Sequence, residues 1–434
     1  MIKKLDDPKT LVRQEAYEDL LYFDERAIPK LIKALKNKNR RIRCYAAGLL
    51  GELGGEHVIQ SLTPILNDKD KRTREVASES IESIKKTLKL KDQHTIKVSL
   101  QKKDMQQTES RKKDHVELVI AKGAQYAKTS GFERVDFIHN ALPEISLSSV
   151  DLSTKFLGKS IRYPLLITGM TGGYSDAEKI NRGLAAAAQK HSIAFGVGSQ
   201  RAMIEKPELA KTYKVRDVAP DIPLLANIGG FQLKKYSFGQ IDSLVQTIEA
   251  DALAVHLNPL QEVIQPEGDT DFTGVLGAIS ATCDKLSVPV LVKETGAGIS
   301  QETAIKLKEA GAKWLDVSGA GGTSWSKVEY LRYLKNAGVH GFEDWGIPTV
   351  EAIIQCRGVL PLIASGGVRS GIDGAKAIAL GADLCGAAYP FIKALRAKSL
   401  EQSLGVFEKQ MQICAYLTGS KTIEELKKAK MRIN

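Results

Sequence analysis

The sequence has little that would point to a membrane, a secretory route or a disulfide framework. No run approaches 18 consecutive apolar residues, so we expect no membrane span. The first eight residues lack the apolar stretch of a secretory signal. The cysteines, at positions 44, 283, 356, 385 and 414, are five in number and form no CxxC pair. An odd, scattered set is typical of reduced thiols, and we expect a cytoplasmic protein.

The composition excludes a mainly disordered or fibrous chain. Of 434 residues, 43% are hydrophobic and 26% are charged, which is ordinary for a globular protein with two or three domains. The net charge is +11, and it is uneven: residues 1–110 hold 23 Lys+Arg and 17 Asp+Glu, and the rest holds 39 and 34. A segment with an excess of basic residues, as in 1–110, either attracts nucleic acid or an acidic partner or forms a solvated helical face. We adopt the last interpretation and expect no nucleic-acid partner.

Residues 1–90 repeat with a spacing of 30 or 31 residues, which is visible in two sets of phased positions: Arg13, Arg43 and Arg74, and Ala16, Ala46 and Ala77. Polar breaks at 37–39 and 67–70 follow each unit. The pattern predicts pairs of short amphipathic helices, each covered by its neighbour, and it resembles HEAT-like repeats. We therefore predict an all-α repeat domain over 1–90, a basic linker over 91–110 and a further domain over 111–434.

The pattern changes beyond residue 160, where eight short apolar runs alternate with helical stretches. The predicted strands are 164–168, 193–197, 224–228, 253–257, 289–293, 314–317, 361–364 and 383–386. Eight apolar strands with intervening helices indicate a closed parallel (β/α)₈ TIM barrel, in the α/β class. An open doubly wound sheet is the alternative, and the count of eight favours the barrel.

Polar or glycine residues follow nearly every predicted strand. In a barrel these ends meet on one face, where active sites are built. The ends after strands seven and eight, 365–369 and 386–387, are typical of phosphate-binding loops. Lys293 ends strand five inside an apolar run and needs a negative neighbour, either the edge of a reduced flavin or the side chain of Glu294.

A second anionic site is indicated by Arg111, Lys112, His115, Arg201 and His256, because Arg and His side chains suit phosphate. Glu262 is a candidate Mg²⁺ ligand, since Mg²⁺ prefers a carboxylate together with substrate phosphates. Gln261 is adjacent and close enough in sequence to touch the same substrate.

The ordered series of these segments resembles the FMN-dependent type II isopentenyl diphosphate isomerases over residues 111–417. The matching stretches are Arg111–His115, Met170–Gly173, Gly198–Arg201, Ala226–Gly229, His256–Glu262, Gln265–Asp269, Val292–Glu294, Val317–Trp325, Asp344–Thr349 and Ser365–Arg369. The HEAT-like repeat lies outside that family's usual pattern.

The resemblance implies roles for individual residues. FMN would be held by Thr168, Met170, Thr171, Gly172, Ser199, Asn227, Lys293, Ser318, Thr323, Gly367, Val368, Arg369, Gly386 and Ala387. The substrate would meet Arg111, Lys112, His115, Ser199, Gln200, Arg201 and Gln261. His256, Asn258 and Gln261 are the catalytic candidates, and Glu262 would bind Mg²⁺.

The implied reaction converts isopentenyl to dimethylallyl diphosphate by adding one proton and removing another. Reduced FMN would serve as the proton shuttle, with NAD(P)H as reductant. The rivals are another FMN-dependent TIM-barrel oxidoreductase and a non-enzymatic adaptor. An oxidase of hydroxy acids would carry His-Gly-x-Arg near strand seven, and a dehydrogenase resembling the IMP enzyme would carry a cysteine after strand six. We also expect a homo-oligomer, a tetramer or larger, and an unknown protein partner for the repeat.

Overall fold

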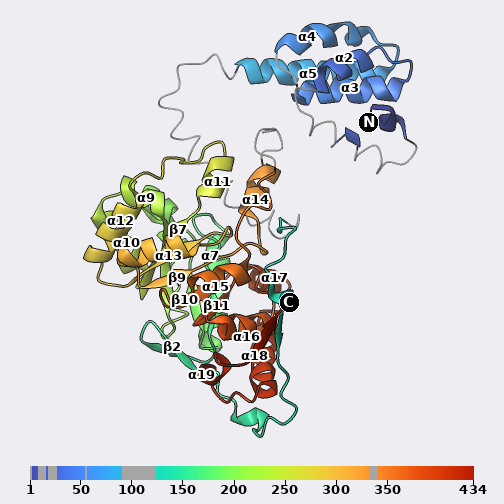
Figure 1. Cartoon of the computed structure of the whole chain (residues 1–434). Helices are drawn as coiled ribbons and strands as arrows, with labels where there is room; N and C mark the ends of the chain where they lie inside the picture. The colour runs from blue at the N-terminus through green and yellow to red at the C-terminus, as the bar shows by residue number, and fades with distance from the viewer. Residues whose placement is uncertain (1, 8–15, 18–26, 54–55, 90–123, 333–340) are drawn as a thin grey trace. The chain divides into compact units, whose positions relative to one another are not determined.

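The computed structural model describes residues 2–7, 16–17, 27–53, 56–89, 124–332 and 341–434. The described residues up to 89 belong to one compact unit, and those from 124 onward belong to another (Figure 1). Their hydrophobic cores have no residue in common. The predicted linker over 91–110 lies outside the described residues.

The N-terminal unit is helical throughout its described part. Its elements are η1 (Ile2–Asp6), α2 (Ile28–Ala34), α3 (Arg40–Leu53), α4 (Glu56–Leu62), η3 (Thr63–Asn67) and α5 (Lys71–Lys89). The pairs α2–α3 and α4–α5 confirm the predicted two-helix repeats. The phased Ala46 and Ala77 are fully buried, and a Cβ on Gly51 would collide with Ser80. Small side chains therefore allow α3 and α5 to pack closely.

The periodic arginines have a structural task. The Arg43 guanidinium donates to the carbonyl oxygens of Asn37 and Lys38 at 2.9 and 3.0 Å. Arg74 repeats this one unit later, donating to the carbonyl oxygens of Asp68 and Lys69. Each arginine thus satisfies the carbonyl groups of the turn that precedes its helix. Arg13 lies outside the described residues.

The second unit contains the predicted barrel, with all eight strands parallel and closed in the order β10-β11-β4-β5-β6-β7-β8-β9. The strands are β4 (Leu165–Ile167), β5 (Ala194–Gly196), β6 (Leu224–Gly229), β7 (Ala252–Leu257), β8 (Val290–Glu294), β9 (Trp314–Asp316), β10 (Leu362–Ala364) and β11 (Leu384–Ala387). Closure excludes the open doubly wound sheet. Buried Val, Ile and Leu side chains dominate the outer face of these strands, which the helices cover.

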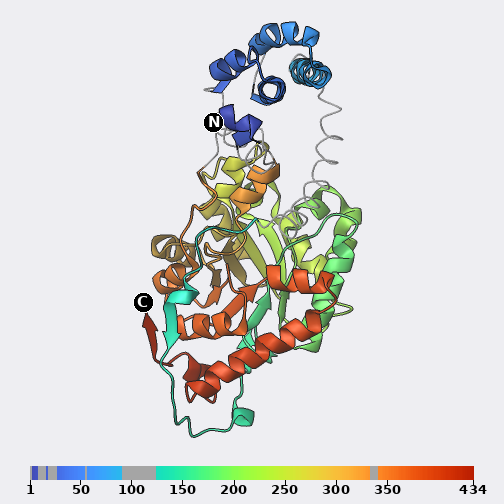
Figure 2. The ribbon, with the colours of Figure 1, turned by 90° about the vertical axis from the view of Figure 1, so that its right-hand side faces the viewer.

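Helices and short elements surround the barrel. The longer helices are α7 (Ala177–Lys190), α10 (Phe238–Ile248), α12 (Val275–Lys285), α13 (Gln301–Glu309), α14 (Trp325–Arg332), α15 (Thr349–Cys356), α16 (Gly371–Leu380), α17 (Tyr389–Arg396) and α18 (Leu400–Leu417). The shorter ones are η4 (Phe132–Arg134), η5 (Leu147–Ser149), α8 (Arg201–Glu205), η6 (Pro207–Thr212), α9 (Gly230–Lys235), α11 (Pro259–Ile264) and α19 (Ile423–Leu426). Figure 2 shows the C-terminal strand β12 (Met431–Ile433) beside β1 (Val135–Phe137), with which it pairs antiparallel. In the described residues, none of the helices has the length and apolar character that a membrane crossing requires.

A hairpin closes the amino end of the barrel. Strands β2 (Thr154–Phe156) and β3 (Lys159–Ile161) pair antiparallel. Phe156 and Ile161 join the apolar cluster inside the barrel, and the Phe156 ring meets Trp314 edge-on at 4.8 Å. Because this end is filled by side chains, an internal cavity has to lie at the carboxyl end.

Candidate active site

A layer of polar side chains lies directly above the apolar layer of the barrel interior. Every strand contributes to the apolar layer, and the residues of that layer nearest the carboxyl ends are Leu166, Ala194, Leu225, Ala254, Leu291, Trp314, Ile363 and Leu384. Since side chains alternate along a strand, the residues two positions later point the same way. These are Thr168, Gly196, Asn227, His256, Lys293, Asp316, Ser365 and Gly386. Six of the eight, all but Gly196 and Asp316, line a cavity.

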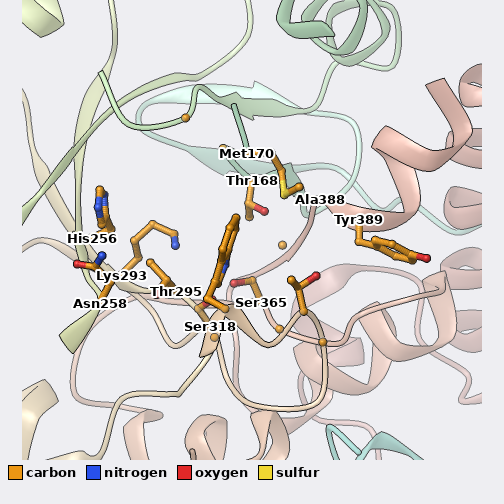
Figure 3. A pocket seen from close by; sticks show the side chains of 18 of the residues that line it. Thr168, Met170, His256, Asn258, Lys293, Thr295, Ser318, Ser365, Ala388 and Tyr389 are labelled. Carbon is orange, nitrogen blue, oxygen red and sulfur yellow. The ribbon is translucent and has the colours of Figure 1, made fainter. Parts of the chain in front are cut away.

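The cavity opens at the carboxyl ends of the strands. Its empty volume, including the open mouth, is about 1470 Å³. In Figure 3, the Lys293 side chain points into the cavity between His256 on one side and Thr168 on the other.

One end of the cavity is rich in glycine. Gly366 and Gly367 both have positive φ, at 96° and 73°. A Cβ on Gly366 would collide with the carbonyl oxygen of Gly319, so the loop after β10 can pack against the loop after β9 only with glycine there. The Arg369 guanidinium lies 4.7 Å from the centre of the Tyr389 ring and donates to the side chain of Gln125. Burial lowers the pKa of Arg369. Exposed backbone, glycine and one arginine suit a phosphate group.

The middle of the cavity holds Lys293, whose Nζ donates to the carbonyl oxygen of Glu294. The Glu294 carboxylate does not pair with that ammonium group by a hydrogen bond; its Oε2 accepts the backbone N–H groups of residues 295, 296 and 297. Burial raises the pKa of Glu294 to about 7. On the next strand, burial also raises the pKa of Asp316, which accepts the hydroxyl of Ser365 at 2.6 Å.

At the far end, Asn227 fixes the ring of His256. The Asn227 amide nitrogen donates to the carbonyl oxygen of Val197 at 3.1 Å, so its Oδ1 faces His256 Nδ1 at 2.8 Å and accepts a hydrogen bond from the Nδ1–H group. In the neutral ring, Nε2 is then the nitrogen without a proton. A second proton on Nε2 would turn His256 into a cation, which suits contact with an anionic substrate.

Gln261 is held by a buried glutamate. Its amide nitrogen donates to Oε1 of Glu329 at 2.8 Å, and its amide oxygen accepts from Asn258 at 3.3 Å. Glu329 is fully buried and is paired with Arg332. The contact joins α11, after the fourth barrel strand, to α14, after the sixth, and it leaves the Gln261 amide in one orientation.

Two further groups complete this end. Glu262 accepts Asn258 Nδ2 through Oε1 and both Gln265 Nε2 and the Asp269 N–H through Oε2. Arg201 donates from Nε to Glu205 at 2.7 Å, and the Tyr236 hydroxyl donates to the same oxygen at 3.0 Å. Burial alone would lower the pKa of Arg201, but the pair with Glu205 outweighs it and the pKa is raised. The guanidinium is therefore a permanent cation.

The structure brings most of the sequence-predicted site residues into this one cavity. All fourteen residues suggested for FMN line it, as do Arg201, His256, Asn258, Gln261 and Glu262. Gln200 does not: its side chain is fully buried, donates to the carbonyl oxygen of Leu244 and accepts the N–H of Asn227. The structure therefore does not bring Gln200 into the cavity, and its side chain fixes the strand end instead. Arg111, Lys112 and His115 lie outside the described residues.

Sequence reasoning missed several residues of the site. Glu329 and Asp316 are buried carboxylates that contact lining residues, and neither belongs to a motif that signals a role. Gln125 reaches Arg369 and donates to Thr323 at 3.4 Å. Tyr389, two residues after the end of β11, lines the cavity and could have been found by extending that segment by two residues.

The residues present fit a flavin mononucleotide. The Thr171 hydroxyl is buried at the cavity wall with no hydrogen-bond partner among the described residues, and a bound ligand would supply one. The glycine-rich end suits the phosphate, and Lys293 suits the edge of the ring that becomes negative on reduction.

For Mg²⁺, the protein itself offers fewer ligands. In the described part of the chain no cluster of three or more acidic, histidine or cysteine side chains is arranged as a metal site, so Glu262 would need substrate phosphates as co-ligands.

Comparisons with known proteins agree with this geometry. Residues 251–433 match the family profile of FMN-dependent dehydrogenases, and residues 1–82 match that of HEAT repeats. An isopentenyl-diphosphate delta-isomerase of Rickettsia felis is 47% identical over 332 residues, covering 74% of this chain and 96% of the relative. The enzyme of that name from Pyrococcus furiosus is 46% identical, covering 73% and 85%. The one from a Synechococcus strain is 54% identical, covering 65% and 84%.

Solved structures agree on the fold. A lactate oxidase of Pediococcus acidilactici superposes with a TM-score of 0.54 at 18% identity, covering 75% of this chain and 94% of that one. A mandelate oxidase gives 0.52 at 16% identity, covering 76% and 99%. The fold and the cavity define a (β/α)₈ barrel with a site at the carboxyl ends of its strands, and residues 251–433 match the profile of FMN-dependent dehydrogenases. More narrowly, the chain belongs to the FMN-dependent isopentenyl-diphosphate delta-isomerase family, with HEAT-like repeats added before the barrel.

Proposed function

We propose that the protein converts isopentenyl diphosphate to dimethylallyl diphosphate, with FMN in its reduced form and Mg²⁺. The observation that carries the proposal is the cavity itself. It combines a glycine-rich end, a central lysine and a third region with Arg201, His256 and Glu262. Relatives bearing the name of this isomerase are 46–54% identical over most of their length.

The cavity favours cofactor-assisted proton transfer. Two proton transfers at carbon usually call for a paired acid and base. Among the described residues, Glu262 is the only acidic side chain that lines the cavity. It already accepts three hydrogen bonds from protein groups, as given above. Reduced FMN would supply the proton-exchanging group and an electron-rich face, while the protein supplies binding and orientation.

The residues of the chain then have separate tasks. Lys293 and the glycine-rich loop after β10 hold the flavin. Arg201 and His256 bind the diphosphate, together with Arg111, Lys112 and His115 as the sequence predicts. Glu262 and the substrate phosphates coordinate Mg²⁺. Gln261, oriented by Glu329, lies beside the hydrocarbon and restricts its motion, so that each proton is added or removed at one carbon.

An anaerobic assay tests the proposal. The protein is loaded with FMN, and isopentenyl diphosphate is added either to the oxidised form or after bleaching with NADPH. We expect dimethylallyl diphosphate only from the reduced form. Equal rates would refute the need for reduction, and no product from flavin-loaded protein in either form would refute the isomerase.

The metal has its own test. Because Glu262 is the single protein carboxylate at the proposed Mg²⁺ site, Glu262→Gln should raise the Mg²⁺ concentration that gives half-maximal activity by about tenfold or more. The matched control is Glu267→Gln. Glu267 does not line the cavity and pairs with Arg332 at 3.4 Å, so that variant should keep the Mg²⁺ dependence of the wild type.

The oxidoreductase alternative has a distinct readout. The fold is shared with lactate and mandelate oxidases, so anaerobic addition of either hydroxy acid should bleach the bound flavin if the chain were such an enzyme. The loop after β10 is Ser365-Gly366-Gly367-Val368-Arg369, without the histidine predicted for that chemistry. We expect no bleaching.

We propose a cytoplasmic homo-oligomer, a tetramer or larger, in which the HEAT-like unit binds a further protein. Light scattering on the full chain measures the number of subunits. Capture with residues 1–110 as bait, compared with the same bait carrying Arg43→Ala, identifies partners that need the folded repeat.

A further inference from the structure

Gln232 is a buried glutamine of the cavity wall whose side-chain amide has no partner among the described residues. It lies in α9, three residues after the end of β6, and only 6% of it is exposed. Of the three glutamines that line the cavity, Gln261 and Gln265 each donate to a glutamate, whereas the Gln232 amide forms no hydrogen bond with the described residues. A buried amide without a partner is costly, so a ligand in the cavity is expected to supply one.

Gly229 makes room for this amide. Its φ of −76° and ψ of 147° are open to any residue, so the backbone conformation does not require glycine there. A Cβ on Gly229 would instead collide with Gln232 Oε1 and would lie 3.0 Å from His256 Nε2. The Gln232 amide and the His256 ring therefore flank the same point at the end of β6.

The surroundings of the Gln232 amide suit a phosphate group. Tyr236, directly after α9, donates to Glu205, which also accepts from Arg201, so the helix that carries Gln232 is tied to the partner of that cation. A side-chain amide adds N–H donors without adding charge, and its hydrogen bond to a phosphate oxygen is charge-assisted. Against a hydrocarbon, the same amide would remain unpaired.

We propose that Gln232 is a further substrate-binding residue, whose amide nitrogen donates a hydrogen bond to the phosphate group that His256 also contacts. The inference deepens the proposed function and rests on it, because it assigns one more contact to the same diphosphate. The gap left by Gly229 has the complementary task of letting the amide lie beside the His256 ring.

The test compares turnover with binding of inorganic pyrophosphate, which carries the two phosphates without the hydrocarbon. In Gln232→Leu, which keeps most of the side-chain volume, we expect KM for isopentenyl diphosphate and the inhibition constant of pyrophosphate to rise together, each by about tenfold. Both are measured on FMN-loaded protein at a fixed Mg²⁺ concentration. The kcat should change less than twofold, and the dissociation constant of FMN should stay at the wild-type value.

Two further variants sharpen this comparison. Gln232→Glu places a carboxylate beside the phosphate, so it should raise both constants more than Gln232→Leu does. Gln246→Leu is the matched control, because Gln246 is exposed on α10 and does not line the cavity. It should leave both constants unchanged. If Gln232→Leu does not fold, Gln232→Asn replaces it: this variant keeps the amide but withdraws it by one methylene, and it should still raise the inhibition constant.

Each other outcome overturns the inference. A raised KM with an unchanged pyrophosphate constant would place Gln232 against the hydrocarbon, and a loss of FMN affinity would place it against the flavin. Wild-type constants in Gln232→Leu would mean that the amide contacts no ligand. These results count only against Gln232, provided that the wild-type protein forms dimethylallyl diphosphate. A wild-type protein that forms none would refute the proposed function itself.

Discussion

At the scale of single residues, Glu294 makes the stability of the barrel depend on pH. Its carboxyl group is enclosed at the end of β8, and burial raises its pKa from 4.5 to about 7. A carboxyl group with a raised pKa in the folded state contributes stability below its unfolded pKa, and that contribution is lost as the pH rises through the folded value. The wild-type barrel should therefore lose roughly 3 kcal/mol between pH 4.5 and pH 8 through this group.

The measurement uses Glu294→Gln, which keeps the size of the side chain and an acceptor for the backbone N–H groups. Tryptophan fluorescence reports the barrel alone, because all three tryptophans, at 314, 325 and 345, lie in that unit. In guanidinium titrations, the stability of the variant relative to wild type should rise steadily from pH 5 to pH 8. A constant difference across this range would show that Glu294 has an ordinary pKa.

At the scale of elements, the loop after β10 should fail to hold FMN when one glycine is changed. A Cβ on Gly367 would lie 2.7 Å from the Gly321 carbonyl oxygen and 2.7 Å from the Ser130 Cβ, in addition to the cost of positive φ. The loop has to move away from its neighbour, so Gly367→Ala should weaken FMN binding by about tenfold or more. Fluorescence titration of the apoprotein with FMN measures the dissociation constant.

Gly358→Ala is the control for that prediction. Gly358 also has positive φ, at 78°, but a Cβ there meets nothing within 4 Å. It bears the same backbone strain without the collision, so it should reduce stability while leaving FMN affinity unchanged. Equal losses of affinity in both variants would mean that backbone strain alone, rather than contact between the two loops, governs the site.

Two arginines of the repeat unit, Arg43 and Arg40, should contribute very different amounts to its stability. Arg43 holds the preceding turn and pairs with Asp68 at 2.7 Å, with side-chain exposures of only 14% and 8%. Without the Arg43 guanidinium, the two carbonyl oxygens of the preceding turn and the Asp68 carboxylate lose their hydrogen-bond donor. Arg43→Ala should therefore destabilise the unit by ~2–3 kcal/mol. Arg40 is 70% exposed in its pair with Asp70, and Arg40→Ala should cost ~0–1 kcal/mol. Circular dichroism should show the shift while tryptophan fluorescence does not, since the repeat unit has no tryptophan.

The strands and their ends could be predicted from sequence because both leave local signals. A buried parallel strand is a short apolar run, and the residues after it must be polar or glycine wherever a cavity is built. The same locality limits what the sequence predicts for Gln200. Ser199 and Arg201 line the cavity on either side of it, yet its own side chain turns into the protein to bond Leu244 and Asn227. The direction of one polar side chain depends on neighbours that are distant in sequence.

Glu329 and Asp316 illustrate a further limit. Glu329 contacts Gln261 across 68 positions in sequence, on a helix whose pattern indicates only amphipathic packing. Asp316 accepts the hydroxyl of Ser365 across 49 positions in sequence, and that contact is fixed by closure of the whole barrel. Buried carboxylates that orient other side chains leave no mark in a single sequence, because their partners are set by packing and not by spacing.

At the scale of the whole molecule, the repeat unit should be separable from catalysis. The Rickettsia relative is matched over 96% of its length by 74% of this chain, so about a quarter of this chain has no counterpart in it. The two hydrophobic clusters are also disjoint. A variant lacking residues 1–90 keeps Arg111, Lys112 and His115, and each domain with its own core can fold alone. Its kcat and KM for isopentenyl diphosphate should therefore stay within about twofold of the full chain. A large rise in KM alone would show that the repeat helps to bind substrate, whereas an unchanged KM with lost oligomerisation would assign it to assembly.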